Sequence, residues 1–314
     1  MIHRKKISYR NERSHSETLR VFQTVHGFHK MDVNEPFQSS ICRPTDILNF
    51  ADWVTQPSQE KDFTILKNLL WHTKERSMLH RKYWEFIYII RVLCERNMLR
   101  TGMKGLGFAV GTEPLASIFA SYGCKVLCSD LSPDNESAKE WAKSNQHANQ
   151  LNDLYLPNIC TKENFQNNVQ FMYLDMNHIP DDLKNFDFCW SACAYEHLGS
   201  LEYGKQFIYN MLKTLKPGGI AVHTTEINLS SNTDTFISNN CSIFRQCDFE
   251  EMYNILTREG HQVSPLDFRL DGCPVDSIIS YPPYDALNSV MPHFKILIDS
   301  YISTSFGMII KKKE

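Results

Sequence analysis

The stretch that decides the fold runs from Lys104 to Leu115 and reads KGLGFAVGTEPL. Its first half, up to Phe108, is a short apolar run that predicts a buried strand. Glycine then breaks the run, and a helix-compatible segment begins at Leu115. Pro114 suits the first helical turn, because its missing N–H has no partner to lose there. The stretch therefore predicts a strand, a tight turn and a helix.

The turn in this stretch is suited to ligand binding. Small residues at Gly107, Ala109 and Gly111 let a ligand lie against the main chain, whose N–H groups face outward at a helix N-terminus. A second apolar run ends at Asp130, and an acid at the end of the second strand of a nucleotide-binding unit can accept from both ribose hydroxyls. The G-x-G-x-x-G fingerprint is not matched, so the turn alone also fits an ordinary βα turn of any α/β domain.

Three later segments narrow the choice. Residues 169–176 read VQFMYLDM, residues 186–198 read FDFCWSACAYEHL, and residues 215–223 read LKPGGIAVH. In this order and spacing they resemble the class I S-adenosylmethionine (SAM) dependent methyltransferases, in particular a methyltransferase-11-like subgroup with a GxGTEPL turn and an LKPGG motif. The resemblance implies an α/β, Rossmann-like fold: a seven-stranded, mostly parallel sheet with an antiparallel last strand, plus an N-terminal helical cap.

The resemblance covers residues 102–260 and includes one departure. The usual first-strand pattern, acid-x-Gly-x-Gly-x-Gly, appears here as Gly107-x-Ala109-x-Gly111-x-Glu113. The acid that normally holds the methionine amino group is missing from its usual place. We expect Glu113 to supply a carboxylate instead. Many members of the subgroup belong to glycan and secondary-metabolite pathways.

The resemblance also implies the cofactor, SAM, and the residues that hold it. The turn should contact the methionine part, Asp130 the ribose, Asp175 the adenine amino group and Met176 the adenine ring. The complete set expected to bind the cofactor is Gly107, Ala109, Gly111, Glu113, Asp130, Leu131, Asp175, Met176 and Ser191.

Four residues are candidates for the chemistry. Glu196 and His197 lie where relatives place groups close to the transferred methyl, and histidine is suited to proton removal near neutral pH. Equally, His197 could only orient the turn or stack on the cofactor. His223 and Glu226 are the second candidates, but strand alternation puts them on opposite faces, so they should not form a dyad. A divalent ion held by Glu196, His197 and Glu226 lacks a recognisable ligand spacing, and we predict no metal site.

Composition sets the broad class. The 314 residues are 42% hydrophobic and 22% charged, as in an ordinary globular protein. No apolar run approaches the roughly 18 residues that span a bilayer, and the N-terminus does not read as a secretory signal. A net charge of −3 gives no general attraction to nucleic acid. The ten cysteines form no C-x-x-C pair, which favours reduced thiols in the cytoplasm.

We divide the chain into three parts. Residues 1–44 form a polar arm that could complete a homo-oligomer contact, residues 45–100 a helical cap, and residues 101–314 the SAM-binding domain.

In the cap, a helix is expected from Pro57, and residues 77–99 place an apolar stripe at helical spacing. In the domain, strands are expected near 104–108, 125–129, 169–174, 186–190 and 219–225, and a Pro-Gly-Gly turn precedes the last of them. The helix after the second strand carries Ala138 and Asn145, and residues 146–168 show little periodicity. Residues 228–240 are dense in Ser, Thr and Asn, as in a lid beside an active site. The Tyr-Pro-Pro-Tyr sequence at 281–284 is interpreted as a loop turn.

The sequence therefore predicts a SAM-dependent methyltransferase that methylates a hydroxyl of a sugar, glycan or related small metabolite. The alternatives are an inactive SAM-binding partner subunit, or a methyltransferase that acts on nucleic acid or protein. A nicotinamide-dependent dehydrogenase is disfavoured by the LKPGG motif and the absent fingerprint.

Overall fold

The computed structural model describes residues 36–54, 79–135, 146–282, 284 and 292–314. Most of the expected arm therefore lies outside the described residues. So do the helix expected from Pro57 and the helix expected around Ala138 to Asn145.

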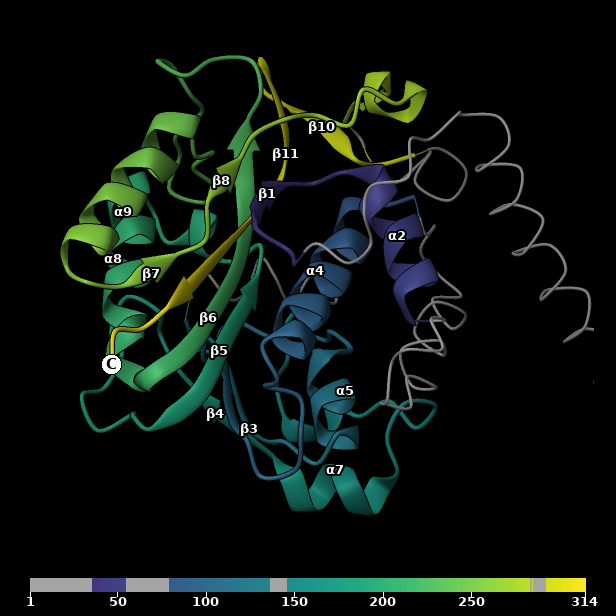
Figure 1. The fold of residues 1–314 in the computed structure, drawn as a ribbon, viewed down its shortest axis with the longest axis vertical. Coiled ribbons are helices and arrows are strands. Elements are labelled where there is room, and N and C mark those ends of the chain that lie inside the picture. Colours follow the sequence, from purple (N-terminus) through teal and green to yellow (C-terminus); the bar gives the residue numbers. More distant parts are fainter. Residues whose placement is uncertain (1–35, 55–78, 136–145, 283, 285–291) are drawn as a thin grey trace, which may run out of the picture.

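One twisted sheet forms the centre of the molecule (Figure 1). Its five parallel strands lie in the spatial order β4-β3-β2-β5-β6, and the long β11 then pairs antiparallel with β6 from Ser303 to Lys311. This confirms the predicted Rossmann-like sheet with an antiparallel last strand, to which short strands at the β11 side are added. The strands are β1 (Ser39–Ile41), β2 (Lys104–Gly107), β3 (Lys125–Asp130), β4 (Val169–Tyr173), β5 (Phe186–Ala192), β6 (Leu215–Asn228), β7 (Gln262–Val263), β8 (Leu266–Asp267), β9 (Ile279–Ser280), β10 (Lys295–Ile298) and β11 (Tyr301–Lys311).

Helices cover both faces of the sheet (Figure 1). One face carries α2 (Pro44–Val54), α4 (Arg81–Glu95), α5 (Leu115–Ser121) and α7 (Lys162–Asn168), and the other carries α8 (Leu201–Met211) and α9 (Gln246–Arg258). Each face has its own apolar core, as expected for a parallel sheet. Short 3₁₀ helices are η1 (Leu151–Leu154), η2 (Tyr195–His197), η3 (Leu212–Thr214) and η4 (Pro274–Ser277).

The expected helical cap is part of this layered structure. The apolar stripe predicted along residues 77–99 forms α4, which is buried almost all round and packs on β5, β6 and β11. Residues 39–41, which the sequence analysis placed in the arm, form β1 beside β11. The described parts of the arm and of the cap therefore belong to the sheet and to one of its helical layers.

The LKPGG motif differs from the expected turn. It lies inside β6, where the pairing with β5 shifts between Phe186 and Phe188. Gly218 has φ +72°, a left-handed conformation that glycine adopts without strain, and its N–H donates to the carbonyl of Lys312. The motif is thus a bulge that the C-terminal strand holds in place.

The topology fixes where a ligand can bind. The chain goes from β2 through α5 to β3, but the later strand β5 pairs with β2 on its other side. The strand order therefore reverses between β2 and β5. Open α/β sheets bind their ligands at the carboxyl ends of the strands at such a switch point.

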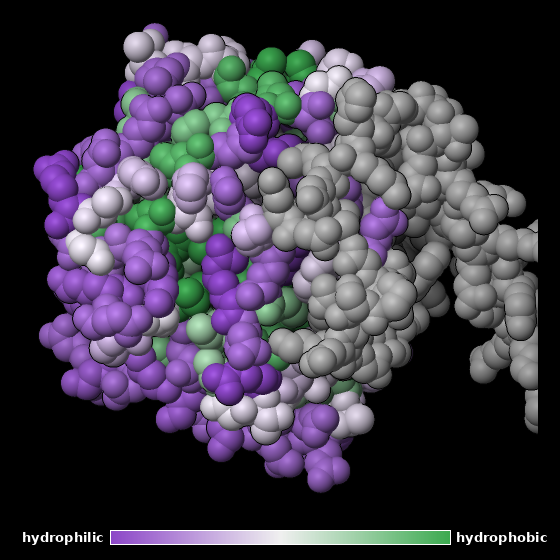
Figure 2. Space-filling view, in the orientation of Figure 1, coloured by the Kyte–Doolittle hydropathy of each residue, from purple (hydrophilic) through white to green (hydrophobic). Residues whose placement is uncertain are grey.

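The surface is mainly hydrophilic on the face seen in Figure 2, and hydrophobic residues lie in gaps between the hydrophilic ones and at the upper edge of the view. Among the described residues, no helix is both long and apolar enough to cross a membrane.

Candidate active site

The turn after β2 has an unusual backbone. Ala109 and Gly111 both have positive φ, at +46° and +50°. This conformation costs energy in a residue with a side chain, and such strain is concentrated at functional sites. A Cβ added at Gly111 would lie 2.4 Å from the carbonyl oxygen of Gln146. The small residues of the turn thus let the main chain of another segment approach closely.

Gly107 packs closely against the core. A Cβ at this position would lie 2.4 Å from the ring of Trp190. Its missing side chain makes room for a neighbouring side chain of the core, and no ligand is needed to explain it.

Asp130, at the end of β3, is buried and surrounded by donors. Its Oδ2 accepts from the N–H groups of Gly111 and Ala148, both at 3.1 Å, and its Oδ1 accepts from Leu131 N–H at 2.8 Å. His147 Nδ1 lies 3.3 Å from Oδ1. Burial raises the pKa of Asp130, and these N–H groups and His147 oppose the shift. The carboxylate holds the turn and the segment around residue 147 together.

The role of the segment around residue 147 was not predicted, because residues 146–168 show little periodicity. The amide of Thr112 donates to Gln146 O, and His147 lies almost fully buried beside Asp130. His147 Nε2 is buried without a hydrogen-bond partner in the described part of the chain. A ribose that binds Asp130 would share the carboxylate with the N–H groups that already donate to it.

Glu113 lies beside Lys82, a residue of the first turn of α4. Lys82 Nζ is 3.4 Å from Glu113 Oε1, 2.9 Å from Glu85 Oε2, and donates to the carbonyl of Ala192 at 2.6 Å. Glu113 Oε2 is buried and has no hydrogen-bond partner among the described residues. Burial raises the pKa of Glu113 to about 8, although Lys82 opposes the shift.

Arg81 connects the charged groups around Lys82 to Glu226, near the end of β6. Its Nη2 is 2.6 Å from Glu226 Oε1, and its Nη1 is 3.2 Å from Ser305 Oγ and 3.3 Å from Glu85 Oε1. Cys193, which has φ +49°, donates its S–H to Glu85 at 3.0 Å. We call Arg81, Lys82, Glu85, Glu113 and Glu226 the rim network.

Glu196 and His197 form η2, just past β5. Glu196 Oε2 accepts from Thr225 Oγ1 at 2.8 Å, while its Oε1 is buried without a hydrogen-bond partner in the described residues. Burial raises the pKa of Glu196. His197 Nδ1 is 2.6 Å from the carbonyl of Asn240, and its Nε2 is 3.8 Å from Glu196 Oε1. The His197 side chain is 21% exposed, so small molecules can reach it.

His223 lies in a different environment. It is fully buried on the α8 face, 5.4 Å from the ring of Phe207. Its Nδ1 lies 2.8 Å from Ser191 Oγ, and its Nε2 lies 3.6 Å from Cys189 Sγ. Burial lowers the pKa of His223 to about 3. We call Cys189, Ser191 and His223 the His223 cluster, and its surroundings favour a structural role for both predicted site residues in it.

Asp175 and Met176, the two residues expected to bind adenine, lie in different environments after β4. Asp175 is partly exposed and accepts from Asn177 N–H at 2.9 Å, while its Oδ2 lies 2.8 Å from His178 Nδ1. Met176 is buried in the α8 core. Both follow the carboxyl end of β4, on the same edge of the sheet as Asp130.

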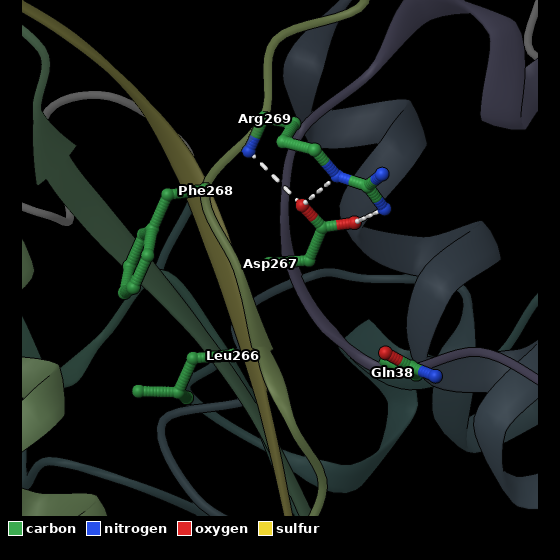
Figure 3. A pocket seen from close by; sticks show the side chains of 5 residues that line it. All are labelled: Gln38, Leu266, Asp267, Phe268 and Arg269. Atoms are coloured by element: carbon green, nitrogen blue, oxygen red, sulfur yellow. Dashed lines mark hydrogen bonds and ion pairs between the residues drawn. The ribbon is translucent and has the colours of Figure 1, made fainter.

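Two other kinds of site, a metal centre and a pocket, were possible outside this edge of the sheet. No group of three or more His, Cys, Asp or Glu side chains that could hold a metal occurs in the described residues. A pocket of about 530 Å³ lies near β1 and β8, lined by Gln38, Leu266, Asp267, Phe268 and Arg269 (Figure 3). Its carboxylate, Asp267, is already held by Arg269 at 2.7 Å and by Arg43 at 2.8 Å. None of the expected site residues lines this pocket.

Comparison with known families agrees with the geometry at the sheet edge. Residues 106–223, which run from β2 to the middle of β6, match the family model described as a methyltransferase domain, Methyltransf_11. This part of the chain is therefore similar to a methyltransferase domain, which supports SAM as the cofactor. Comparison with the curated proteins gives no match.

Parts of solved structures also align with this chain, all at low identity. Magnesium protoporphyrin IX methyltransferase (ChlM) from Synechocystis PCC 6803, with bound SAH, aligns at TM-score 0.42 and 9% identity over 83% of this chain and 93% of that one. A SAM-dependent methyltransferase from Clostridium acetobutylicum ATCC 824 aligns at TM-score 0.39 and 12% identity, over 75% and 92%. The 4+2 cyclase SpnF aligns at TM-score 0.39 and 18% identity, over 56% of this chain and 58% of the cyclase.

The residues at the methyltransferase switch point fit the cofactor's chemistry. The cofactor carries an α-ammonium, and the unpartnered Oε2 of Glu113 is a buried acceptor for such a group. The rim network contains three carboxyl groups and two cations. When a bound ammonium group ionises Glu113, the carboxylates exceed the cations by one charge, which complements a ligand with a positively charged sulfur.

Proposed function

We propose that the protein is a SAM-dependent O-methyltransferase of class EC 2.1.1, with His197 as the general base. The acceptor would be a hydroxyl on a sugar, glycan or related small metabolite. Asp130 would hold the ribose, Glu113 the α-ammonium, and Asp175 and Met176 the adenine.

The observation that carries this proposal is the hydrogen bond of His197. A carbonyl can only accept, so the contact with Asn240 O at 2.6 Å requires the proton on Nδ1. In the neutral ring, Nε2 is then the acceptor and can take a proton. The buried Glu196 Oε1, 3.8 Å from Nε2, would stabilise the imidazolium that forms.

The roles of the residues follow from this tautomer. The cofactor, held by Asp130, Glu113, Asp175 and Met176, would supply a methyl group from its positively charged sulfur. Nε2 of His197 would accept the proton that the substrate hydroxyl loses when it takes up this methyl group. Asn240 fixes the ring, and the loop that carries Asn240 is tied to η2 because Ser242 N–H donates to Glu196 O at 2.8 Å. The protein mainly aligns the donor and the acceptor.

A small hydroxylated acceptor is supported by the groups beside His197. The loop after β6 lies against His197 at Asn240 and is rich in Ser, Thr and Asn, whose hydroxyl and amide groups pair with sugar hydroxyls. The chain's net charge of −3 does not favour nucleic acid as the partner. All ten cysteines are free thiols, which supports our proposal of a reducing compartment, the cytoplasm.

A second candidate is a SAM-binding subunit without activity. It is favoured by Asp130, whose carboxylate already receives three backbone N–H groups. If those contacts are permanent, the ribose loses its main ligand and catalysis would be impaired.

A methyl-transfer screen with labelled SAM separates the two candidates. Nucleotide sugars, glycans and small phenols are offered as acceptors, and binding of S-adenosylhomocysteine (SAH) is measured by calorimetry. Label transferred to a hydroxyl by the wild type, and lost in His197→Ala, supports the proposal. Tight SAH binding without transfer to any acceptor class favours the inactive subunit.

A further inference from the structure

The ion pair between Lys82 and Glu113 bridges the switch point of the sheet. Glu113 follows the turn after β2, and Lys82 donates to Ala192 O, the last residue of the neighbouring β5. The two charges therefore lie across the ends of β2 and β5, where the strand order reverses. Lys82 lies outside the matched domain, which begins at residue 106.

The pair is poorly matched for a purely structural role. Its separation of 3.4 Å is the longest of the three contacts of Lys82 Nζ, and Glu113 Oε2 has no partner in the described residues. A buried carboxylate with one unsatisfied oxygen is costly. An opposite charge placed beside Oε2 would remove that cost.

The position of Lys82 on its helix also indicates that its role is not purely structural. Arg81 and Lys82 occupy the first turn of α4, where the helix dipole disfavours cations, and this turn contains no acidic residue. Burial alone would lower the pKa of Lys82, but Glu85 and Glu113 raise it well above its usual value. The lysine is thus kept charged at a place that local helix preferences disfavour, a pattern expected of functional sites.

We propose that Lys82 binds the α-carboxylate of the cofactor and, with Glu113 on the α-ammonium, forms a site for its zwitterionic amino-acid end. Entry of the zwitterion replaces the long contact between Lys82 and Glu113 with two contacts between opposite charges. Glu85 and Ala192 O keep Lys82 in place during this exchange. This inference rests on the cofactor assignment of the proposed function.

The test compares two ligands that differ only in this end. SAH carries the amino acid, whereas 5′-methylthioadenosine lacks it. Calorimetry on the full chain should show that Lys82→Ala weakens SAH binding by about tenfold to a hundredfold, the usual effect of losing a hydrogen bond to a charged group. Binding of 5′-methylthioadenosine should stay unchanged, and Lys82→Arg should recover part of the SAH affinity.

The matched control is Lys205→Ala. Lys205 is also a buried lysine held by carboxylates, 2.9 Å from Asp248 and 2.6 Å from Glu251, but it lies on α8. Its replacement should leave both affinities unchanged. Equal losses for both ligands in Lys82→Ala, or no loss for SAH, would overturn the proposal.

A measurement on the wild type covers the case in which Lys82→Ala does not fold. SAH should bind about tenfold or more tightly than its decarboxylated analogue. Equal affinities would overturn the role of Lys82 while leaving the cofactor assignment intact. If the wild type binds neither SAH nor 5′-methylthioadenosine, the cofactor assignment fails, and this inference and the proposed function fail with it.

Discussion

The His223 cluster and the rim network are both buried polar groups beside the same strands, yet they differ in how well they are satisfied. In the His223 cluster, both ring nitrogens have partners and aromatic rings surround the imidazole. In the rim network, Glu113 Oε2 lacks a hydrogen-bond partner among the described residues, and the same holds for the nearby Glu196 Oε1. Groups of the first kind stabilise a fold, whereas unsatisfied groups at a switch point are available to a ligand.

The largest effects are expected when each histidine is replaced, which tests the different roles of His197 and His223. His197→Ala should lower kcat by about two to four orders of magnitude, because a positioned base contributes that much, while SAH affinity stays nearly intact. Single-turnover rates with the identified acceptor would measure the effect. A mild loss at His197 beside a severe one at His223 would move the role of base to β6, and mild losses at both would favour alignment without a base.

His223→Ala should act on stability. The change leaves a cavity in the α8 core and leaves Ser191 Oγ without its ring partner, at a cost of about 2–4 kcal/mol in unfolding free energy. Urea unfolding of wild type and variant would measure it. His197→Ala, at a partly exposed position, is the control and should cost less. A stability equal to that of the wild type would show that the His223 cluster does not hold the core together.

The positions of several strands along the chain were predictable from sequence, because buried parallel strands are short apolar runs that end in turn signals. The predicted strands at 104–108, 125–129 and 169–174 agree with β2, β3 and β4 within a residue. LKPGG was wrongly expected to be a turn, because the tie between Gly218 and Lys312 joins distant parts of the chain. Local patterns contain no information about such a partner.

The site was predictable only in part, for the same reason. The end of a predicted strand marks Asp130, and the turn after another marks Glu113, but nothing near them in sequence indicates His147 or Lys82. Lys82 meets Glu113 because α4 crosses the sheet, and His147 meets Asp130 through a segment without periodicity. One local signal was present: two cations begin a mainly apolar helix, against the helix dipole.

The ribose assignment is a smaller test of the comparison. Asp130→Ala should weaken SAH binding by about 1.5–3 kcal/mol, the range for hydrogen bonds to a charged group. Titration calorimetry would measure the change, with Asp153→Ala as a control because that carboxylate serves only its own turn. Unchanged affinity would mean that Asp130 serves the backbone alone, like the groups of the His223 cluster.

The smallest effect is expected from the protonation of Glu113. Burial raises the pKa of this carboxyl from 4.5 to about 8, so in the free protein it mostly holds a proton at neutral pH. An α-ammonium beside Oε2 favours the carboxylate and lowers that pKa, so binding must release a proton.

Affinity for SAH should therefore rise with pH below 8, by about tenfold from pH 6 to pH 7, which is about 1.4 kcal/mol of binding free energy. Glu113→Gln should flatten this rise, whereas Glu202→Gln, at an exposed position, should keep it. Calorimetry in buffers of different ionisation heats would count the released proton. A wild-type affinity that does not change between pH 6 and pH 8 would place Glu113 with the satisfied, structural groups.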